Sequence, residues 1–372
     1  MKVLLCIPCL MTGGTEIQTL NLVHALTEGG HEVWTLCYFE YSGEMLERYR
    51  KAGSKVILLS SGGNRAGGWR DVLLLFKGLR KALRQIHPDV AHVQYMAPGA
   101  IPIVILRLLG CRCVIATTHT AADIYPSLRL VHFIQRHCVR AFTCITETAE
   151  KSFFGTSRLY SEDLVLKKRN HFTIYNALPK NFAIAQTPRE FGRPIVLGVV
   201  SRLEHIKGMD LVISAYAEIL KEFPDTKLII VGDGALRQSL EQQAVALHCD
   251  SSITWAGRQP QEHIQEWYSR IDVLLMPSRS EGFGLTAIEA MASGCVVVAS
   301  DVGGLPEVVL DGEVGLLHTS ESVSDIVEKV KKLIANPGLM ERLSANAVKH
   351  VGQYSLDRYT QLFNDLYPKL SR

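Results

Sequence analysis

The sequence predicts an α/β protein of two doubly wound domains, each with a parallel sheet between layers of helices. Short apolar runs rich in β-branched residues alternate with helical patterns throughout the 372 residues, which is typical of parallel sheets buried on both faces. A polar, proline-bearing stretch without periodicity, residues 179–194, separates two such series. The chain is also longer than one core usually supports. We therefore expect domains at residues 1–183 and 184–372, facing each other across a cleft at the carboxyl ends of their strands.

Seven apolar runs predict the strands of the first domain: KVLLCIP, HEVWTLCY, KVILLS, DVAHVQY, CVIATTH, AFTCIT and FTIYNAL. Helical patterns lie between them, as at residues 16–28 and 69–86. Six runs predict the strands of the second domain: PIVLGVVS, KLIIVGDG, SITWAGR, DVLLMPS, CVVVAS and VGLLHT. From about Ser355 an amphipathic helix carries the apolar residues Tyr359, Leu362, Phe363, Leu366 and Tyr367, and this helix could return to the first domain.

Composition indicates a globular protein of the cytoplasm. No apolar run reaches the roughly 18 residues of a membrane-spanning helix. Most of the nine cysteines lie in strand-like runs, which suits reduced, buried thiols better than a disulfide framework. Residues 1–185 hold 22 Lys and Arg against 13 Asp and Glu, a net charge of +9, so the remaining residues carry −6 of the total of +3. A basic first half favours contact with an anionic surface or substrate, and no nucleic-acid partner is expected.

The helical pattern at residues 69–86 is one place where such contact could occur. It combines Trp69 and several leucines with a set of cations: Arg70, Lys77, Arg80, Lys81 and Arg84. This pattern suits an interfacial helix at an anionic membrane. A helix packed on the core with a basic solvent face explains it equally well.

Charged residues follow the strands of the second domain where parallel strands end. Arg202 and Lys207 flank the loop after PIVLGVVS, and two fixed cations there can neutralise a diphosphate. Gly232 and Asp233 form a tight turn after the next strand, and Arg258 follows the one after that. Ordinary turns explain these last three residues, Gly232, Asp233 and Arg258, nearly as well, and they remain candidates for binding the same ligand.

The stretch PSRSEGFGLTAIEAMASG places Glu281 and Glu289 eight positions apart around a glycine-bracketed turn that opens an apolar helix. Backbone that can approach a ligand closely is supplied by Phe283, Gly284, Leu285 and Thr286. A helix N-terminus attracts phosphate, whereas glutamates suit hydroxyl groups. The pattern therefore predicts a ligand with both groups, such as a sugar nucleotide. The preference for acidic residues at helix starts would explain Glu289 alone, but not the pair with its glycines.

Two features of the first domain follow strands in the same way. Gly13 and Gly14 form a loop that lacks the full dinucleotide fingerprint, which argues against hydride transfer. This loop could instead fold over a phosphate or an acceptor. His119 ends the run CVIATTH and is the histidine best placed to face a cleft, with Asp123 a few residues further on.

Together these stretches resemble the retaining glycosyltransferases of family 4, which have the GT-B fold. The matching motifs occur in order along nearly the whole chain: TGGTE, THT, SRLEHIKG, VGDG, EGFGLTAIEAMASG and DVGGLPEVV. The Glu-x(7)-Glu element preceded by an Arg and Lys pair is the specific part. The resemblance implies that the second domain binds the donor and that the first domain binds the acceptor.

The resemblance also implies a role for each matching residue. Arg202 and Lys207 would hold the diphosphate, Glu281 the donor sugar and Glu289 the ribose, while His119 would touch the sugar from the first domain. The backbone at residues 283–285 would contact sugar and phosphate. The family often has glycine where this chain has Ser201, and a small residue or Asp where Thr120 follows the histidine, which leaves the role of Asp123 open.

The implied reaction is hexosyl transfer with retained anomeric configuration and with neither a metal nor another cofactor. No Asp-x-Asp motif occurs, and the two cations can supply the charge that a metal would. We expect a UDP- or GDP-sugar donor and a glycan, lipid-linked or small-molecule hydroxyl acceptor, in cell-surface polysaccharide or glycolipid synthesis at the inner face of the membrane. A sugar-nucleotide 2-epimerase, a disaccharide phosphorylase and an inactive sugar-nucleotide-binding module remain alternatives.

Overall fold

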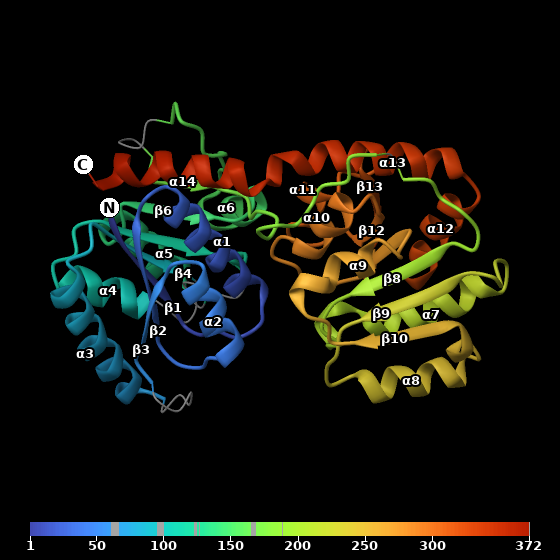
Figure 1. The fold of residues 1–372 in the computed structure, drawn as a ribbon, viewed down its shortest axis with the longest axis horizontal. Coiled ribbons are helices and arrows are strands. Elements are labelled where there is room, and N and C mark those ends of the chain that lie inside the picture. Colours follow the sequence, from blue (N-terminus) through green and yellow to red (C-terminus); the bar gives the residue numbers. More distant parts are fainter. Residues whose placement is uncertain are drawn as a thin grey trace. The chain divides into compact units, whose positions relative to one another are not determined.

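The chain forms two compact units in the computed structural model, which describes residues 1–60, 67–94, 100–122, 125, 127–164, 169–187 and 189–371. The first unit contains residues 1–180 together with the segment from Tyr354 onward, and the second contains residues 181–353 (Figure 1). The described part of the predicted linker, residues 179–187 and 189–194, holds neither helix nor strand. The last helix therefore lies with the first unit.

The first unit is built on a seven-stranded parallel sheet of order β3-β2-β1-β4-β5-β6-β7. Its strands are β1 (Lys2–Ile7), β2 (Glu32–Cys37), β3 (Lys55–Leu58), β4 (Val90–Gln94), β5 (Val114–Thr118), β6 (Ala141–Cys144) and β7 (His171–Thr173). Its helices are α1 (Gly14–Glu28), α2 (Gly43–Lys51), α3 (Trp69–Ile86), α4 (Ala100–Leu108), α5 (Leu128–His137), α6 (Glu147–Phe154) and α14 (Leu356–Ser371). The sheet explains the long apolar runs, because both faces of its strands are buried: one against α1, α2 and α14, the other against α3 to α6.

Helix α14 belongs to the hydrophobic core of the first unit, and a buried chain of hydrogen-bonded polar groups connects it to the sheet. It packs against α1, and Phe363 and Tyr367 are almost fully buried. The Tyr367 hydroxyl lies 2.6 Å from Nδ1 of His92 in β4, and Nε2 of His92 lies 2.6 Å from the Thr117 hydroxyl. Burial lowers the pKa of His92 to about 3, so the ring is neutral and can both donate and accept in this chain.

The second unit is built on a six-stranded parallel sheet of order β10-β9-β8-β11-β12-β13. Its strands are β8 (Val196–Val200), β9 (Lys227–Val231), β10 (Ile253–Gly257), β11 (Val273–Met276), β12 (Val296–Ser300) and β13 (Gly315–His318). Its α-helices are α7 (Met209–Leu220), α8 (Arg237–Ala246), α9 (Ile264–Tyr268), α10 (Leu285–Ala292), α11 (Leu305–Val308), α12 (Val323–Ile334) and α13 (Pro337–His350). The short 3₁₀ helices are η2 (His205–Lys207), η3 (Asp250–Ser252), η4 (Gln261–His263) and η5 (Val351–Tyr354). Twelve of the thirteen predicted apolar runs contain a whole strand, and the run FTIYNAL contains the last two residues of β7. The predicted fold class is confirmed.

Side-chain caps explain where several helices begin. Six described helices start after a residue whose side chain accepts a hydrogen bond from a backbone N–H of the first turn: Ser42, Ser127, Thr146, Ser322, Asn336 and Ser355. Such a cap satisfies one of the N–H groups that the helix itself leaves without a partner. Helices α1 and α10, which follow the two glycine loops singled out from the sequence, instead begin after glycines without a side-chain cap. Their first N–H groups are thus not occupied by a side chain of the N-cap residue.

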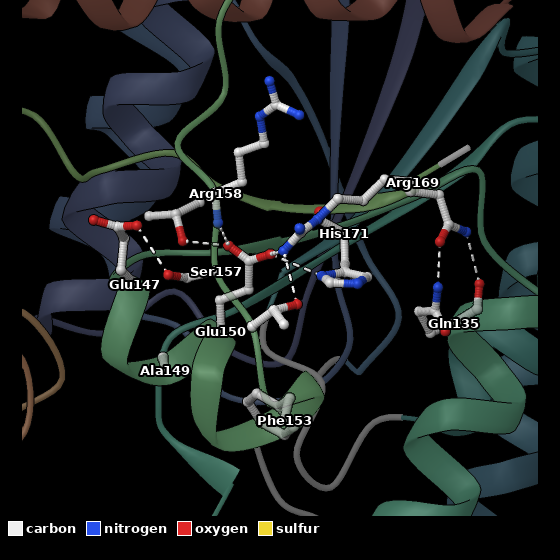
Figure 2. Close-up of polar contacts among 12 residues, drawn as sticks. Gln135, Glu147, Ala149, Glu150, Phe153, Ser157, Arg158, Arg169 and His171 are labelled. Atoms are coloured by element: carbon white, nitrogen blue, oxygen red, sulfur yellow. Dashed lines mark hydrogen bonds and ion pairs between the residues drawn. The ribbon is translucent and has the colours of Figure 1, made fainter. Parts of the chain in front are cut away.

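A buried carboxylate in α6 secures the segment that leads into β7. Glu150 is fully buried and accepts hydrogen bonds from the Arg158 backbone N–H at 2.9 Å, the Thr173 hydroxyl at 2.8 Å and the Arg169 guanidinium at 2.8 Å. Nδ1 of His171 lies 2.7 Å from the same carboxylate (Figure 2). Burial by itself raises the pKa of Glu150, but the hydrogen bonds from His171, Arg158, Arg169 and Thr173 outweigh it and lower the pKa.

We expect Glu150→Gln to lower the free energy of unfolding at neutral pH by about 1.5–3 kcal/mol, because the amide cannot accept all the charge-assisted hydrogen bonds. The pKa of Glu150 is lower in the folded than in the unfolded state. Its contribution is therefore present above the unfolded pKa and is lost as the pH falls through the folded pKa. Denaturant titrations of both proteins at neutral pH and near pH 3 would test this, since the difference should shrink in acid.

Glu147→Gln is the matched control, because Glu147 lies on the same helix, is only partly buried and accepts a hydrogen bond from the Ser157 hydroxyl at 2.9 Å. If both variants lower the free energy of unfolding equally, the buried hydrogen bonds of Glu150 do not stabilise the protein more than the contact of Glu147 does.

Candidate active site

The strand order of the second sheet changes direction between β8 and β11, and the predicted phosphate-binding and sugar-binding residues follow these two strands. Lys207 ends η2 in the loop after β8, and Glu281 lies in the loop after β11. Nζ of Lys207 lies 2.6 Å from Oε2 of Glu281, and the two side chains are only 21% and 16% exposed. Ligands of doubly wound sheets bind at such a point of reversal. The structure thus joins two residues that are 74 positions apart.

Glycines hold the two loops together. Gly208 has a φ of +64°, and a Cβ at this position would collide with the carbonyl oxygen of Pro277. Gly303 has a φ of +56°, and a Cβ there would collide with the carbonyl oxygen of Glu281. Both positions therefore require glycine for two reasons, backbone conformation and lack of space. The close packing places Lys207 and Glu281 on backbone that has little freedom to move.

Arg202 lies on the same loop as Lys207 but is more exposed. Its guanidinium forms an ion pair with Glu204 at 2.7 Å, and the two side chains are 62% and 39% exposed. An exposed pair of this kind contributes little to stability, so Arg202 can leave Glu204 for a stronger anion at small cost. Both predicted cations are thus paired with carboxylates.

The other donor-binding candidates after β9 and β10 form turns. The Gly232 N–H donates to the carbonyl of Gly257 at 2.8 Å, which joins the ends of β9 and β10. The Asp233 carboxylate accepts from the Gly234 N–H at 2.8 Å and is exposed. Arg258 is exposed on the loop after β10. These contacts are those of ordinary turns, and a role in donor binding stays a prediction.

Helix α10 begins as predicted at Leu285, directly after Gly284, whose φ is +98°. Phe283 is buried, so its side chain contributes to packing and only its backbone can reach a ligand. The Thr286 hydroxyl lies 3.6 Å from Sδ of Met276. The unpaired N–H groups of the first turn are then the main polar feature that α10 can offer to an anion.

Glu289 lies on the second turn of α10 and is bound by partners of its own. It is 6% exposed, accepts from the Tyr268 hydroxyl at 2.8 Å and from Nε2 of Gln261 at 3.3 Å. Burial raises the pKa of Glu289 to about 7, which outweighs the effect of both hydrogen bonds. The two glutamates therefore occupy different environments, one beside a lysine and one among neutral groups.

In the first unit, the glycine loop after β1 lies against a carboxylate. Gly13 is extended and α1 starts at Gly14. A Cβ at Gly13 would collide with the Glu16 carboxylate, which accepts a hydrogen bond from Sγ of Cys9 at 3.0 Å. Burial and the neighbouring Glu16 raise the pKa of Cys9 to about 12, and all nine cysteines are free thiols. A negative charge at this loop suits a hydroxyl-bearing ligand better than a phosphate.

His119 directly follows β5, and its side chain is 8% exposed. Nε2 of His119 lies 3.0 Å from Oε1 of Gln94, the last residue of the adjacent strand β4. Burial lowers the pKa of His119 to about 4, so the ring is neutral at physiological pH. With its Nε2–H donated to Gln94, the ring keeps Nδ1 as a hydrogen-bond acceptor. Asp123 lies outside the described residues.

Four residues at these sites were not singled out from the sequence: Glu16, Gln94, Gln261 and Tyr268. A polar residue that ends a buried apolar strand, as Gln94 does, is a signal that was available. Glu16 was part of the motif TGGTE, but its contact with Gly13 depends on the turn between them. Nothing in the sequence marks Gln261 or Tyr268 as partners of Glu289, because they lie 28 and 21 positions away.

Within the described part of the chain, no group of three or more His, Cys, Asp or Glu side chains could hold a metal ion. Among the described helices, none is long and apolar enough to cross a membrane.

Two parallel doubly wound sheets in one chain, one with a lysine and a glutamate paired where its strand order reverses, define a protein of the GT-B class. The family model for glycosyl transferases group 1 matches residues 181–350, and that for glycosyltransferase family 4 matches residues 12–155. The chain belongs to this family of glycosyltransferases.

Relatives cover the chain to different extents. It is 33% identical to the D-inositol 3-phosphate glycosyltransferase of Streptomyces bingchenggensis over 46% of this chain and 40% of that protein. It is 26% identical to the N-acetyl-α-D-glucosaminyl L-malate synthase of Bacillus anthracis over 99% of this chain and 97% of that protein. The crystal structure of Anabaena Alr3699/HepE in complex with UDP and glucose has the same fold, with a TM-score of 0.77, 18% identity and 98% of both chains covered.

Proposed function

We propose that the protein transfers a hexosyl group from a UDP- or GDP-sugar to a hydroxyl acceptor, with retention of the anomeric configuration. The observation that carries this proposal is the Lys207–Glu281 pair at the reversal of the second sheet, with Arg202 on the same loop. A cation and a carboxylate side by side match the two chemical halves of a sugar nucleotide, its phosphates and its hydroxyls. A related fold that binds UDP and glucose in Anabaena supports the choice of donor.

In this proposal the ion pair changes partners when the donor binds. The diphosphate attracts Lys207 more strongly than one carboxylate does, because it carries more negative charge. Glu281 is then released to accept hydrogen bonds from hydroxyls of the donor sugar. Arg202 and the first N–H groups of α10 add to the positive field at the diphosphate. Glu289, among neutral groups, is free to exchange Gln261 for a ribose hydroxyl.

The reaction breaks the bond between the anomeric carbon and the diphosphate oxygen and forms a bond to the acceptor oxygen on the same face. The acceptor proton passes to the departing phosphate, and positive charge builds up on the sugar ring in the transition state. Lys207, Arg202 and the α10 N-terminus stabilise the charge on the leaving group. His119, neutral and with Nδ1 as acceptor, would contact a sugar hydroxyl from the first unit.

We propose the first unit for acceptor binding, with a glycan, lipid-linked or small-molecule hydroxyl as acceptor. The Glu16 carboxylate beside Gly13 supports a hydroxyl group at the glycine loop. The physiological setting would be cell-surface polysaccharide or glycolipid synthesis in the cytoplasm, with peripheral contact at the inner face of the membrane.

A screen of UDP- and GDP-sugars tests the function directly. The true donor should raise the melting temperature and be hydrolysed slowly in the absence of an acceptor, because water then takes its place. A donor whose sugar is epimerised without transfer would identify an epimerase. Cleavage of a disaccharide by phosphate without any nucleotide would identify a phosphorylase. Stabilisation without any turnover, with or without acceptors, would identify an inactive binding module.

Activity is expected to survive EDTA with less than about a twofold change, because fixed cations take the place of a metal at the diphosphate. Initial rates of donor turnover with and without excess chelator measure this. Complete loss of activity that Mg²⁺ or Mn²⁺ restores would contradict metal-independent transfer and leave the donor assignment intact.

A further inference from the structure

The outer sides of three consecutive helices gather most of the exposed large apolar side chains of the described residues. Fourteen such side chains are exposed, and nine of them lie on α3, α4 and α5: Trp69, Val72, Leu73, Phe76, Ile101, Leu108, Leu128, Leu130 and Phe133. Trp69 is 71% exposed and Leu108 is 77% exposed. Helix α3 packs against α4, and α4 packs against α5 (Figure 1). We call the outer side of these three helices the α3–α5 surface.

The three helices pack against the same face of the first sheet, so their outer sides point away from that face. Their buried residues all belong to the apolar core on one face of the first sheet, among them Leu79, Ile103 and Ile134. The exposed residues therefore point away from the same face. On α3 they are spaced at i, i+3, i+4 and i+7, from Trp69 to Phe76, which is one stripe along the helix.

Charge on these helices has one sign. They carry eight Lys and Arg, which are Arg70, Lys77, Arg80, Lys81, Arg84, Arg107, Arg129 and Arg136, against one acidic residue, Asp71, so their net charge is +7. Asp71 accepts a hydrogen bond from the Gly67 N–H at the start of its own helix. No ion pair joins any of the eight cations to a carboxylate among the described residues, so no described acidic side chain compensates their charge.

The opposite face of the same sheet provides an internal comparison. Helices α1, α2 and α14 carry five Lys and Arg against six Asp and Glu, a net charge of −1, and none of their large apolar residues is exposed. Ion pairs such as Arg50–Glu47 and Lys369–Asp365 neutralise charge there. This face has the properties of an ordinary solvent-exposed layer, and the α3–α5 surface does not.

We propose that the α3–α5 surface docks the protein on an anionic lipid bilayer. Apolar side chains that reach into the acyl boundary, flanked by uncompensated cations at the level of the headgroups, are the features that such a surface requires. Charge complementarity favours a bilayer over a second copy of the chain, because two surfaces of +7 repel each other. The docking is independent of the transfer reaction, and only its use in presenting a lipid-linked acceptor rests on the proposed function.

Flotation of the full chain with two kinds of vesicle tests the proposal. We expect binding to vesicles of phosphatidylcholine mixed with phosphatidylglycerol, weak binding to phosphatidylcholine alone, and release when NaCl is raised to about 1 M. Trp69→Ala combined with Phe76→Ala should lower the partition coefficient at least about tenfold, because the two substitutions remove apolar area that would be buried in the bilayer. Replacing Lys77, Arg80 and Lys81 by Gln should lower it about a hundredfold for the anionic vesicles.

The matched control is Val245→Ala on helix α8 of the second unit combined with Leu247→Ala directly after that helix, because both side chains are also exposed. This variant should bind vesicles as the unchanged protein does. Lack of binding to the anionic vesicles, or equal binding by all variants, would overturn the proposal. So would self-association that the α3–α5 variants abolish without any binding to vesicles. UDP binding is measured on the same variants and should be unchanged. If neither the unchanged protein nor any variant binds UDP, that result counts against the proposed function but leaves the docking result valid.

Discussion

Lys207→Ala is expected to lower kcat/KM by roughly 30- to 1,000-fold, equivalent to about 2–4 kcal/mol of transition-state stabilisation. Lys207 is the less exposed of the two predicted cations on the loop after β8, and it is already paired with Glu281 at 2.6 Å. A cation held in this way needs little reorganisation when negative charge develops on the leaving diphosphate. Arg202→Ala should act in the same direction. Donor titration and steady-state rates measure both effects.

Lys227→Ala is the matched control, because Lys227 is exposed at the opposite, amino-terminal end of strand β9 in the same sheet. Its activity should not change. Melting curves must accompany the measurement, since removal of Lys207 leaves the partly buried Glu281 without its partner. Unchanged kcat/KM in folded Lys207→Ala and Arg202→Ala proteins would remove the diphosphate assignment.

His119→Ala is expected to lower turnover about 100-fold while leaving nucleotide affinity nearly intact. The nucleotide contacts are proposed for the second unit, and His119 lies in the first. An interaction that His119 makes only in the reacting complex affects kcat more than ground-state binding. Calorimetric titration with UDP and GDP, together with single-turnover rates, separates these two quantities.

A purely structural histidine predicts a different result. Because His119 is buried and bound to Gln94, its removal could lower the melting temperature without any effect on the folded enzyme. A His119→Ala protein with normal turnover per folded molecule would place His119 outside the active site. Replacement of buried His92 by Ala provides the comparison, because His92 contacts Tyr367 and Thr117 and no proposed ligand.

The sequence was sufficient for the fold because strands buried on both faces need continuous apolar runs. Twelve of the thirteen runs contain a whole strand, and the helical pattern at residues 69–86 coincides with α3. The run FTIYNAL predicted its strand less exactly, because it contains only Phe172 and Thr173 of the short strand β7. This strand is short because it lies at the edge of the sheet, where among the described residues only β6 and an isolated bridge between Thr173 and Leu159 pair with it.

The candidate site could be predicted as far as its parts lie in continuous motifs. Glu281, the glycine turn and the start of α10 belong to one stretch, and the helix begins where the pattern indicated. Pairings between distant segments could not be predicted, such as Lys207 with Glu281 or Tyr268 with Glu289. These contacts depend on strand order and loop packing, which residue spacing does not specify.

The return of α14 to the first unit has a consequence for the order in which the protein can fold during synthesis. Five residues of α14 fill a core whose other buried members belong to residues 3–177: Tyr359, Phe363, Leu366, Tyr367 and Leu370. That core stays incomplete until α14 has left the ribosome, whereas residues 181–353 contain every strand of their own sheet. Domains generally mature in the order in which they are made. In this chain the half that is made first is expected to be the last to close.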